Sequence, residues 1–585
     1  MSEHILTRAI KSKRYYVILV SLILFHLINN YIWLRIDNVP LIFDAHKNFM
    51  VSLKIFKAFS NFPHSFLSNI IKATESGLYA PFVPFIVSTF YKIIGINYDK
   101  GVMINNIIFL PILVFSAFGI GKKMFNKQVG LLAAFLLTMY PIIFNQLKLY
   151  MLELPAVAMV SLSIYILLRT NNFRNLRYSI LFGMVLSLSI LTHYKTLFFI
   201  IVPLLVVVFY ILLDVLTFFK PIRWHKAVSP QTSNKKSLML RGFNLGISLI
   251  IFMGLLLPYL SSIMSKASFE RKTYLYVTPS DLPINNLGFW SRGMVSTLWY
   301  FKTLIEVQIS FFFLVIFIIG LYFSLKYFKN KRPILFLLFW LIAPFILITY
   351  IFRPVIGYYF NWSSPRYTMP ILVPIALISS AGIMKIYNKK IKFTVIITII
   401  LIGIIQFFAV SFGINLLPSK IKVELPIFKR SNLLPHDILL FNQEIPIPSA
   451  YYSHPTIEKP YYKEILDIIN NTRPKDKRIK ITVIPDIAPL WGYLQYRTYI
   501  ENLPFDILCD AVNIYYWYPV DFRELILDPD YIITKEGGWL SDFYLIGEID
   551  KAMRYFYLHK EKFALIKEIK LAEDETVLIY KRKEK

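Results

Sequence analysis

The chain has 585 residues, of which 56% are hydrophobic and 17% aromatic, and its mean hydropathy is +0.54. A soluble globular protein of this size does not carry so much apolar surface, so the composition excludes that class and favours a membrane protein. A net charge of +29 usually suggests nucleic-acid binding, but the cations lie mainly in short linkers between apolar runs, and we expect no nucleic-acid partner.

The apolar runs predict a polytopic helical membrane protein. Several runs of roughly 18 to 22 residues carry almost no charge, which is the length that a helix needs to cross a bilayer. Placing every basic linker inside, where Glu3 is the only acid, gives about eleven spans and a cytoplasmic N-terminus. We expect the spans near residues 15–36, 102–121, 128–146, 154–169, 178–192, 197–218, 243–261, 307–325, 334–351, 368–386 and 393–416.

Two long outer loops follow from this topology, at about 37–101 and 262–305. Within the first loop, Pro81–Gly95 is apolar but too short to span a bilayer and contains Lys92, so we interpret it as an interfacial or half-inserted helix. The single cysteine, Cys509, excludes an intrachain disulfide and a Cys-rich metal site.

After about Pro418 the composition becomes charged and alternating, which predicts a soluble α/β domain. We therefore divide the chain into a transmembrane module, 1–417, and an extracytoplasmic domain, 418–585. The domain has predicted strands at Ile481–Ile484, Tyr531–Thr534 and Thr576–Tyr580, and a predicted helix at Ala488–Tyr499.

Two carboxylates are expected at the outer face of the membrane. Asp44 follows the helix-breaking Pro40 after the first span, where it can act as a general base toward an acceptor hydroxyl. Glu153 begins the fourth span; it complements the helix N-terminus, and an acid at the membrane boundary is also a candidate site residue. His46 could assist Asp44 or bind a metal, although a lone histidine often does neither.

Cations and aromatic residues on the same side are candidates for binding a phosphate. Lys195, in His193-Tyr194-Lys195, breaks the inside-positive pattern and either snorkels to the headgroups or pairs with an anionic leaving group. Arg366 carries a planar fork suited to phosphate, and Tyr367 follows it. Arg271 and Lys272 are further phosphate candidates in the second outer loop.

The chain has no Walker loop, no dinucleotide-binding glycine fingerprint and no His-Glu-x-x-His motif. We therefore expect no nucleotide-using machinery and no certain cofactor, with a divalent cation left open. The energy for any group transfer would have to arrive with the substrate.

Taken in order, the motifs resemble those of membrane glycosyltransferases of the GT-C superfamily, and within it the protein O-mannosyltransferase-like and aminoarabinose-transferase-like group. The resemblance covers about residues 15–390. It departs from the family where Ala45 replaces an acid after Asp44 and where Glu153 replaces an aspartate. The matching segments are Asp44, Tyr79–Phe85 with the apolar helix to Gly95, Gly121–Phe125, Gly130–Phe135, Tyr140-Pro141 with Glu153, and Pro365–Pro374.

The resemblance implies a GT-C fold and an inverting transfer of a sugar from polyprenyl or dolichyl phosphate to a protein, lipid or glycan hydroxyl. Asp44 would be the base and Glu153 would orient it, the acceptor or the sugar. Arg366 and Lys195 would stabilise the departing lipid phosphate. Tyr79, His193, Tyr367 and His46 would line the substrate site, and membrane lipids would surround the protein.

Two other functions remain open at this stage. One is an oligosaccharyltransferase of the same superfamily, which would need a metal site and a sequon reader, for which Pro489–Tyr493 is a poor match. The other is a flippase or transporter of lipid-linked sugars, which would favour repeated halves and broken helices at the midplane; neither is found.

Overall fold

The structure is a computed structural model that describes residues 2–37, 43–59, 80–219, 235–260, 289–351, 365–414, 422–424, 437–439, 461–474, 477–484, 494–499, 501, 503–507, 522–536, 546–570 and 576–583. The chain forms two compact units. We call Met1–Leu34, Val51–Ala267 and Pro283–His454 the membrane unit. Arg35–Met50, Ser268–Leu282 and Pro455–Lys585 form the C-terminal unit.

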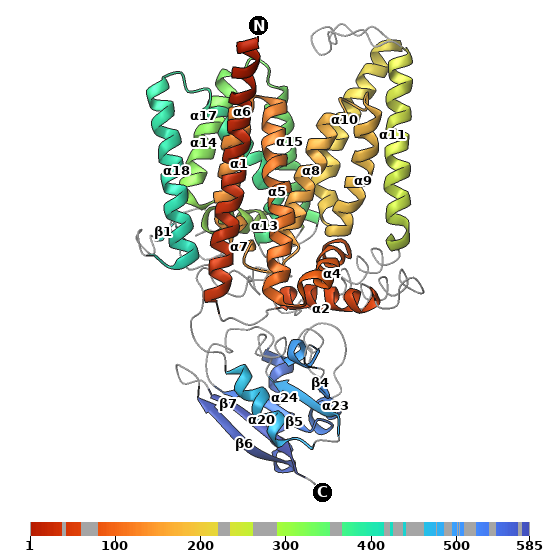
Figure 1. Cartoon of the computed structure of the whole chain (residues 1–585), viewed down its shortest axis with the longest axis vertical. Coiled ribbons are helices and arrows are strands. Elements are labelled where there is room, and N and C mark those ends of the chain that lie inside the picture. Colours follow the sequence, from red (N-terminus) through yellow and green to blue (C-terminus); the bar gives the residue numbers. More distant parts are fainter. Residues whose placement is uncertain are drawn as a thin grey trace. The chain divides into compact units, whose positions relative to one another are not determined.

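The membrane unit is a bundle of long apolar helices (Figure 1). Each span expected from the sequence overlaps a helix. Among the described residues eight helices are long and apolar enough to cross a membrane, and the count of about eleven spans stays a prediction. The protein is an integral membrane protein, as predicted. The helices of the bundle are α1 (Ser2–Ile36), α5 (Tyr98–Met124), α6 (Lys127–Met139), α7 (Pro141–Gln146), α8 (Glu153–Arg169), α9 (Leu176–Thr192), α10 (Thr196–Phe219), α11 (Lys235–Leu256), α14 (Ser310–Tyr327), α15 (Arg332–Ile346), α17 (Leu372–Ile383) and α18 (Lys389–Phe412).

Short irregular helices lie between the long ones. The predicted third span is divided because Pro141 forces Tyr140 into an extended conformation, which ends α6 and starts α7. Two π-helices, η5 (Leu304–Gln308) and η6 (Leu347–Ile351), precede α14 and follow α15. The 3₁₀ helices η3 (Leu257–Tyr259) and η7 (Pro365–Ile371) follow α11 and precede α17.

Glycines let neighbouring helices approach closely. A Cβ atom on Gly121 of α5 would lie 2.5 Å from the Cα atom of Gly130 on α6, and one on Gly320 of α14 would lie 2.5 Å from the Cα atom of Ser379 on α17. In a membrane, where lipid tails match apolar side chains, such close backbone packing is a main source of helix association. Four of the long helices, α5, α6, α9 and α18, also begin at asparagine caps that accept a backbone N–H.

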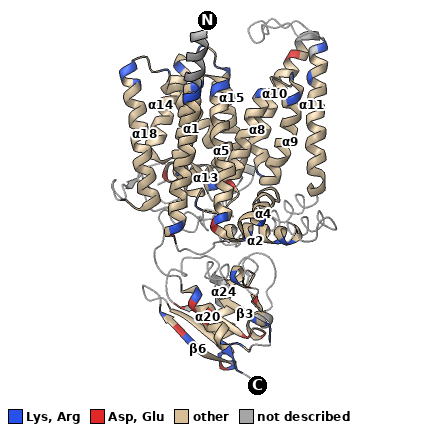
Figure 2. Cartoon of the chain, viewed as in Figure 1, with Lys and Arg blue, Asp and Glu red and all other residues tan. Residues whose placement is uncertain are grey.

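Lysine and arginine gather mainly at one end of the bundle, where α5 joins α6, α8 joins α9, α14 joins α15, and α17 joins α18 (Figure 2). We call this the basic end. The opposite end contains the start of α8, the α9–α10 junction and η7. Successive helix junctions lie alternately at the two ends of the bundle, as the positions of the basic linkers in the sequence predict.

The segments predicted as outer loops contain helices. Pro81–Gly95 forms the short helix α4 (Phe82–Ile94), whose Phe82 packs with the ends of α9 and α11. Two helices were not predicted: α2 (Phe43–Ala58), whose first turns are polar, and α13 (Phe289–Thr303). Several bounds also differ, since α5 begins before residue 102 and α11 before residue 243.

The C-terminal unit contains a five-stranded mixed sheet in the order β4-β3-β5-β7-β6. Strand β3 pairs in parallel with β4 and β5, and β7 pairs antiparallel with β5 and β6. The three predicted strands are confirmed, as is the α/β character; of the predicted helix, residues 494–499 are helical and the earlier part lies outside the described residues. The elements are α20 (Tyr462–Thr472), β3 (Ile479–Ile484), β4 (Phe505–Ile507), α23 (Phe522–Leu527), β5 (Tyr531–Glu536), α24 (Ile546–Leu558), η9 (Lys560–Lys562), β6 (Phe563–Lys570) and β7 (Thr576–Arg582).

Strand alternation explains the two cores of this sheet. Tyr531 and Ile533 of β5 pack with α20 on one face, whereas Ile532 packs with α23 and α24 on the other. Successive side chains of a strand point to opposite faces, so one apolar strand serves both layers. A separate pair, β1 (Lys422–Glu424) and β2 (Asp437–Leu439), is antiparallel and belongs to the membrane unit.

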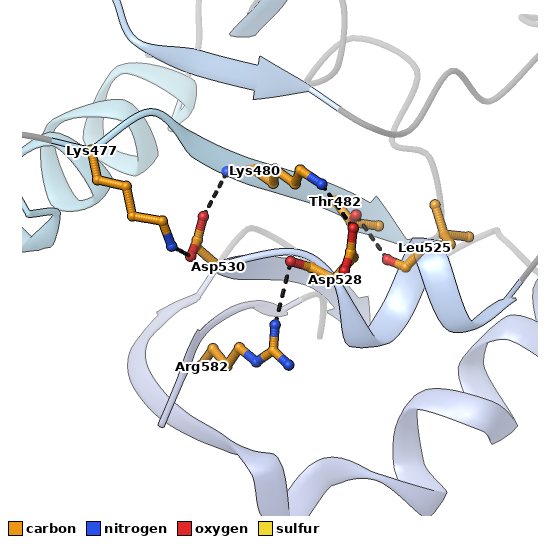
Figure 3. Close-up of polar contacts among 7 residues, drawn as sticks. All are labelled: Lys477, Lys480, Thr482, Leu525, Asp528, Asp530 and Arg582. Atoms are coloured by element: carbon orange, nitrogen blue, oxygen red, sulfur yellow. Dashed lines mark hydrogen bonds and ion pairs between the residues drawn. The ribbon is translucent and has the colours of Figure 1, made fainter. Parts of the chain in front are cut away.

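Ion pairs and hydrogen bonds connect residues at the ends of β3, β5 and β7 (Figure 3). Asp530 accepts from the Lys480 backbone N–H at 2.9 Å and from Lys477 Nζ at 2.7 Å, while Lys480 Nζ lies 2.7 Å from Asp528. Arg582 of β7 donates to the Asp528 carbonyl at 3.5 Å. The Lys480 hydrogen bond and charge lower the pKa of Asp528 below its ordinary value. Lys477, Lys480 and Asp528 are exposed to solvent by 63%, 42% and 51%, so these ion pairs add little stability and mainly fix the strand ends.

Candidate functional site

The candidate site is built around a buried ion pair at the end of the bundle opposite the basic end. Glu153, the first residue of α8, lies 3.1 Å from Arg366 Nε (Glu153 Oε1), and their side chains are 9% and 11% exposed. Arg366 is on η7, far away in the sequence. An isolated buried charge is costly, so each side chain stabilises the other in this position. The structure thus brings together two residues that the sequence marked separately.

Two cations approach the same aromatic ring. Lys195 Nζ lies 3.6 Å from the centroid of Tyr367, and the Arg366 guanidinium carbon lies 5.3 Å from it. A tyrosine face attracts cations through its quadrupole. The formal charges of Lys195, Arg366 and Glu153 sum to one positive charge. We call Glu153, Lys195, Arg366 and Tyr367 the cationic cluster. Its net positive charge suits an anionic group such as a phosphate.

The α9–α10 junction shapes the backbone beside Lys195. His193 ends α9, and its Nδ1 accepts the backbone N–H of Lys195 at 3.2 Å. The His193 and Tyr194 rings stack with centroids 5.2 Å apart. His193 therefore fixes the turn that carries Lys195, in addition to any contact with substrate.

A buried glutamine holds η7 in place. Gln308, the last residue of the π-helix η5, donates through Nε2 to the Pro365 carbonyl at 3.1 Å and to Thr368 Oγ1 at 2.8 Å. Thr368 Oγ1 donates to the same carbonyl at 3.1 Å. Gln308 and Thr368 are both fully buried. These bonds bracket Arg366 and Tyr367 on both sides, so they fix the two residues relative to the bundle. π-helices recur at functional sites because they turn one side chain out of the regular register.

The segment before Glu153 is held by two asparagines. Asn106 Nδ2 donates to the Leu147 carbonyl at 2.6 Å, and Asn105 Nδ2 donates to the Met151 carbonyl at 3.3 Å. Both asparagines are fully buried on α5. Irregular backbone near a membrane needs such partners, because unpaired carbonyls are costly there.

Lys148 in this segment is a buried cation that sequence reasoning missed. Its side chain is 4% exposed, donates to Asn145 Oδ1 at 2.8 Å, and lies 5.2 Å from the Trp33 ring centroid. The signal was present in the sequence: Lys148 follows the third span on the outer side, where it breaks the inside-positive pattern as Lys195 does. Gln308 and Thr368 gave no comparable signal.

The other predicted site residues are not placed with this cluster. Asp44 is the second residue of α2, and its side chain lies outside the description. Tyr79, Arg271 and Lys272 lie outside the described residues. Their roles, and those of the cluster residues in substrate binding, stay predictions.

His46 is described within the C-terminal unit. It is fully buried, and its Nε2 lies 2.8 Å from Gln495 Oε1. Burial lowers the pKa of His46 to about 4, so the imidazole is neutral at physiological pH. Within the described ranges, no three side chains of histidine, cysteine, aspartate or glutamate come together as metal ligands.

Comparison with known proteins supports the resemblance inferred from the motifs. Residues 79–228 match the family model described as dolichyl-phosphate-mannose-protein mannosyltransferase. None of the curated protein sequences matches the chain.

Solved structures of ArnT share the fold, and a further structure aligns with the chain. ArnT from Cupriavidus metallidurans in the apo state aligns with a TM-score of 0.52 and 13% identity, over 97% of this chain and 98% of that one. The same protein bound to undecaprenyl phosphate gives the same values. The archaeal oligosaccharyltransferase AglB from Archaeoglobus fulgidus, in complex with an inhibitory peptide and a dolichol-phosphate, aligns with a TM-score of 0.49 and 14% identity over 95% of this chain and 73% of that one. The chain therefore has the fold of ArnT, and a part of it resembles the dolichyl-phosphate-mannose-protein mannosyltransferase family.

Proposed function

We propose that the protein is a membrane glycosyltransferase of the GT-C superfamily, which takes a sugar from a polyprenyl- or dolichyl-phosphate donor and transfers it to an acceptor hydroxyl of a protein, lipid or glycan. The observation that carries the proposal is the cationic cluster, in which Lys195 and Arg366 flank Tyr367 and Glu153 holds Arg366. A matching family model named for a dolichyl-phosphate mannose enzyme supports it, as does a structure of the same fold bound to undecaprenyl phosphate.

The chemistry follows from where charge develops. The acceptor oxygen attacks the anomeric carbon while the bond from that carbon to the phosphate oxygen breaks, so the transfer inverts the anomeric configuration. Asp44 takes the acceptor's proton, and the bonding electrons leave with the lipid phosphate, which gains one negative charge. Lys195 and Arg366 are suited to stabilise that charge, because preorganised cations in a site of low dielectric act most strongly on it.

Glu153 has a supporting role in this scheme. Its carboxylate faces Arg366, and one acid cannot hold that guanidinium and at the same time act as a freely available base. We therefore assign Glu153 to positioning Arg366, and Asp44 alone to proton abstraction.

The reaction is proposed to occur on the non-cytoplasmic side. The cationic cluster lies at the end of the bundle opposite the basic end, and basic linkers face the cytoplasm in most membrane proteins. In this orientation the N-terminus is cytoplasmic and the C-terminal domain is extracytoplasmic.

Binding of the bare leaving group tests the cluster. Radiolabelled polyprenyl phosphate should bind the full-length protein in nanodiscs saturably, and Lys195→Ala should weaken binding roughly tenfold, the value of one charge-assisted hydrogen bond. Lys100→Ala is the matched control, because Lys100 is an exposed lysine at the same end of the bundle. Equal binding by the two variants would remove the cluster as the phosphate site.

A further inference from the structure

A second charged cluster lies at the basic end of the bundle, where α8, α9, α10 and α11 meet. Arg241 of α11 donates through Nη1 to Asp214 Oδ2 of α10 at 2.6 Å. The Arg241 side chain is fully buried and Asp214 is 13% exposed. Arg174 lies in the α8–α9 connection beside them. We call Arg174, Asp214, Arg241 and Asn244 the arginine cluster.

Arg241 has more donors than the described residues satisfy. In the part of the chain that the structure describes, its Nε and Nη2 atoms are buried without a hydrogen-bond partner, and so is Asn244 Oδ1. A guanidinium stays protonated at any physiological pH, so burial cannot be relieved by losing the charge. Leaving a buried donor without a hydrogen bond is costly, and more so when the donor is charged. Such a group is expected to have a partner outside the described residues, and a bound ligand can supply it.

The charge balance gives the sign of that partner. Asp214 is the only acid between Glu153 and Glu270 in the sequence. The helices α9, α10 and α11 therefore contain a single carboxylate to balance the charges of Arg174 and Arg241. Desolvation, and then the like charge of Arg241, lower the pKa of Arg174. The missing partner should therefore be an anion.

The loop that carries Arg174 is strained. Asn171, Asn172 and Phe173 have φ angles of 54°, 56° and 59°, the left-handed region that residues with side chains rarely adopt. Such residues persist only where the surroundings enforce the conformation, often at binding sites. Here Phe173 is fully buried and its carbonyl accepts from Asn244 Nδ2 at 2.7 Å, which locks the loop onto α11.

The neighbouring helix surfaces are apolar and exposed. Leu212 and Leu216 of α10 are 52% and 55% exposed, and Leu240 and Phe243 of α11 are 47% and 63% exposed, on either side of the Asp214–Arg241 pair. A ligand with apolar chains next to its charge would cover these side chains. A free inorganic anion would leave them uncovered.

We propose that the arginine cluster binds the phosphate group of an anionic membrane lipid. The phosphate oxygens accept from Arg241 Nε and Nη2 and from Arg174, and the acyl chains lie on the exposed faces of α10 and α11. Because Arg174 is half-buried, a phosphate at the membrane boundary can contact it first. Basic sites between helices on the cytoplasmic side are a known form of lipid recognition. The inference is independent of the proposed donor, whose phosphate would bind at the other end of the bundle.

Lipid binding to the full-length protein in detergent tests the proposal through the rise in unfolding temperature. Phosphatidylglycerol should stabilise the wild type saturably and phosphatidylcholine should not. Arg174→Gln should raise the half-saturating concentration about tenfold or more, as expected for the loss of a charge-assisted hydrogen bond. Arg169→Gln is the matched control: Arg169 is exposed, stacks on Tyr178 at 4.7 Å, and lies at the same end of the bundle.

Arg241→Gln alone would leave Asp214 unpaired and could prevent folding, so the double variant Asp214→Asn/Arg241→Gln is used instead. It should fold and lose the preference for phosphatidylglycerol. Equal stabilisation by the two lipids, or equal half-saturation for Arg174→Gln and Arg169→Gln, would overturn the proposal. If inorganic phosphate alone displaces the lipid and reproduces the full stabilisation, the site takes a soluble phosphate ester and the lipid assignment is wrong.

Discussion

The Glu153–Arg366 pair allows a quantitative test of the candidate site. The two side chains are about nine-tenths buried and 3.1 Å apart. Removing one member of a buried pair leaves the other charge uncompensated and costs about 3–5 kcal/mol, whereas removing both costs much less than the sum. We expect Glu153→Gln and Arg366→Gln each to lower the free energy of unfolding by about 3 kcal/mol, with a coupling energy of about 2–3 kcal/mol between them.

The assay is a double-mutant cycle, with unfolding of the full-length protein followed in detergent. The matched control is Arg478–Asp506, a pair with a similarly short separation of 2.6 Å whose side chains are 69% and 40% exposed. Its coupling energy should stay below about 1 kcal/mol, because solvent screens exposed pairs. Additive effects at Glu153 and Arg366, or a coupling no larger than that of the control, would refute the account of this pair.

Adding polyprenyl phosphate to the same cycle separates structure from function. The phosphate should stabilise Glu153→Gln more than the wild type, because it supplies the counter-charge that Arg366 has lost. Strong coupling without any effect of the lipid would keep the pair as a structural feature and remove Arg366 from the donor site.

Three further outcomes are expected. Thr368→Val and Gln308→Leu should each raise KM for the donor roughly tenfold by loosening η7, whereas Thr368→Ser should restore it; equal effects of valine and serine would contradict the hydrogen-bond account. Lys195→Met should lower kcat more than it weakens acceptor binding, as measured by steady-state kinetics, and an unchanged kcat would remove it from charge stabilisation. Because burial lowers the pKa of His46 to about 4, its contribution to stability should be complete above pH 6.5 and lost as the pH falls toward 4. The free energy of unfolding should fall by about 2 kcal/mol more between about pH 7.5 and about pH 5 in the wild type than in His46→Gln. An equal fall in the two proteins would refute this account.

The membrane fold was largely predictable because the patterns that produce it can be read directly along the sequence. A bilayer requires long apolar helices and places basic linkers on one side, and both patterns can be counted along the chain. The helices α2 and α13 were missed because this approach finds only apolar runs of spanning length. Their sequences mix polar and apolar residues, so neither forms an apolar run of spanning length.

The members of the site were easier to predict than their arrangement. Glu153, Lys195 and Arg366 were recognised because charges are expensive at a membrane boundary. The pairing of Glu153 with Arg366 depends on how α8 packs against η7, which no local pattern encodes. Gln308 was missed because a neutral amide at the start of a span has no charge to mark it, and its role appears only in its two hydrogen bonds to η7.

The most direct test of the central claim is transfer from a lipid-linked donor. Full-length protein in nanodiscs would be given radiolabelled polyprenyl-phosphate hexoses, with membrane lysate supplying acceptors, and wild type would be compared with Asp44→Asn. The account predicts that label moves to an acceptor with the wild type and not with Asp44→Asn, while both bind the donor. Saturable donor binding without transfer by the wild type from any of the sugars, or transfer by Asp44→Asn at the wild-type rate, would contradict it.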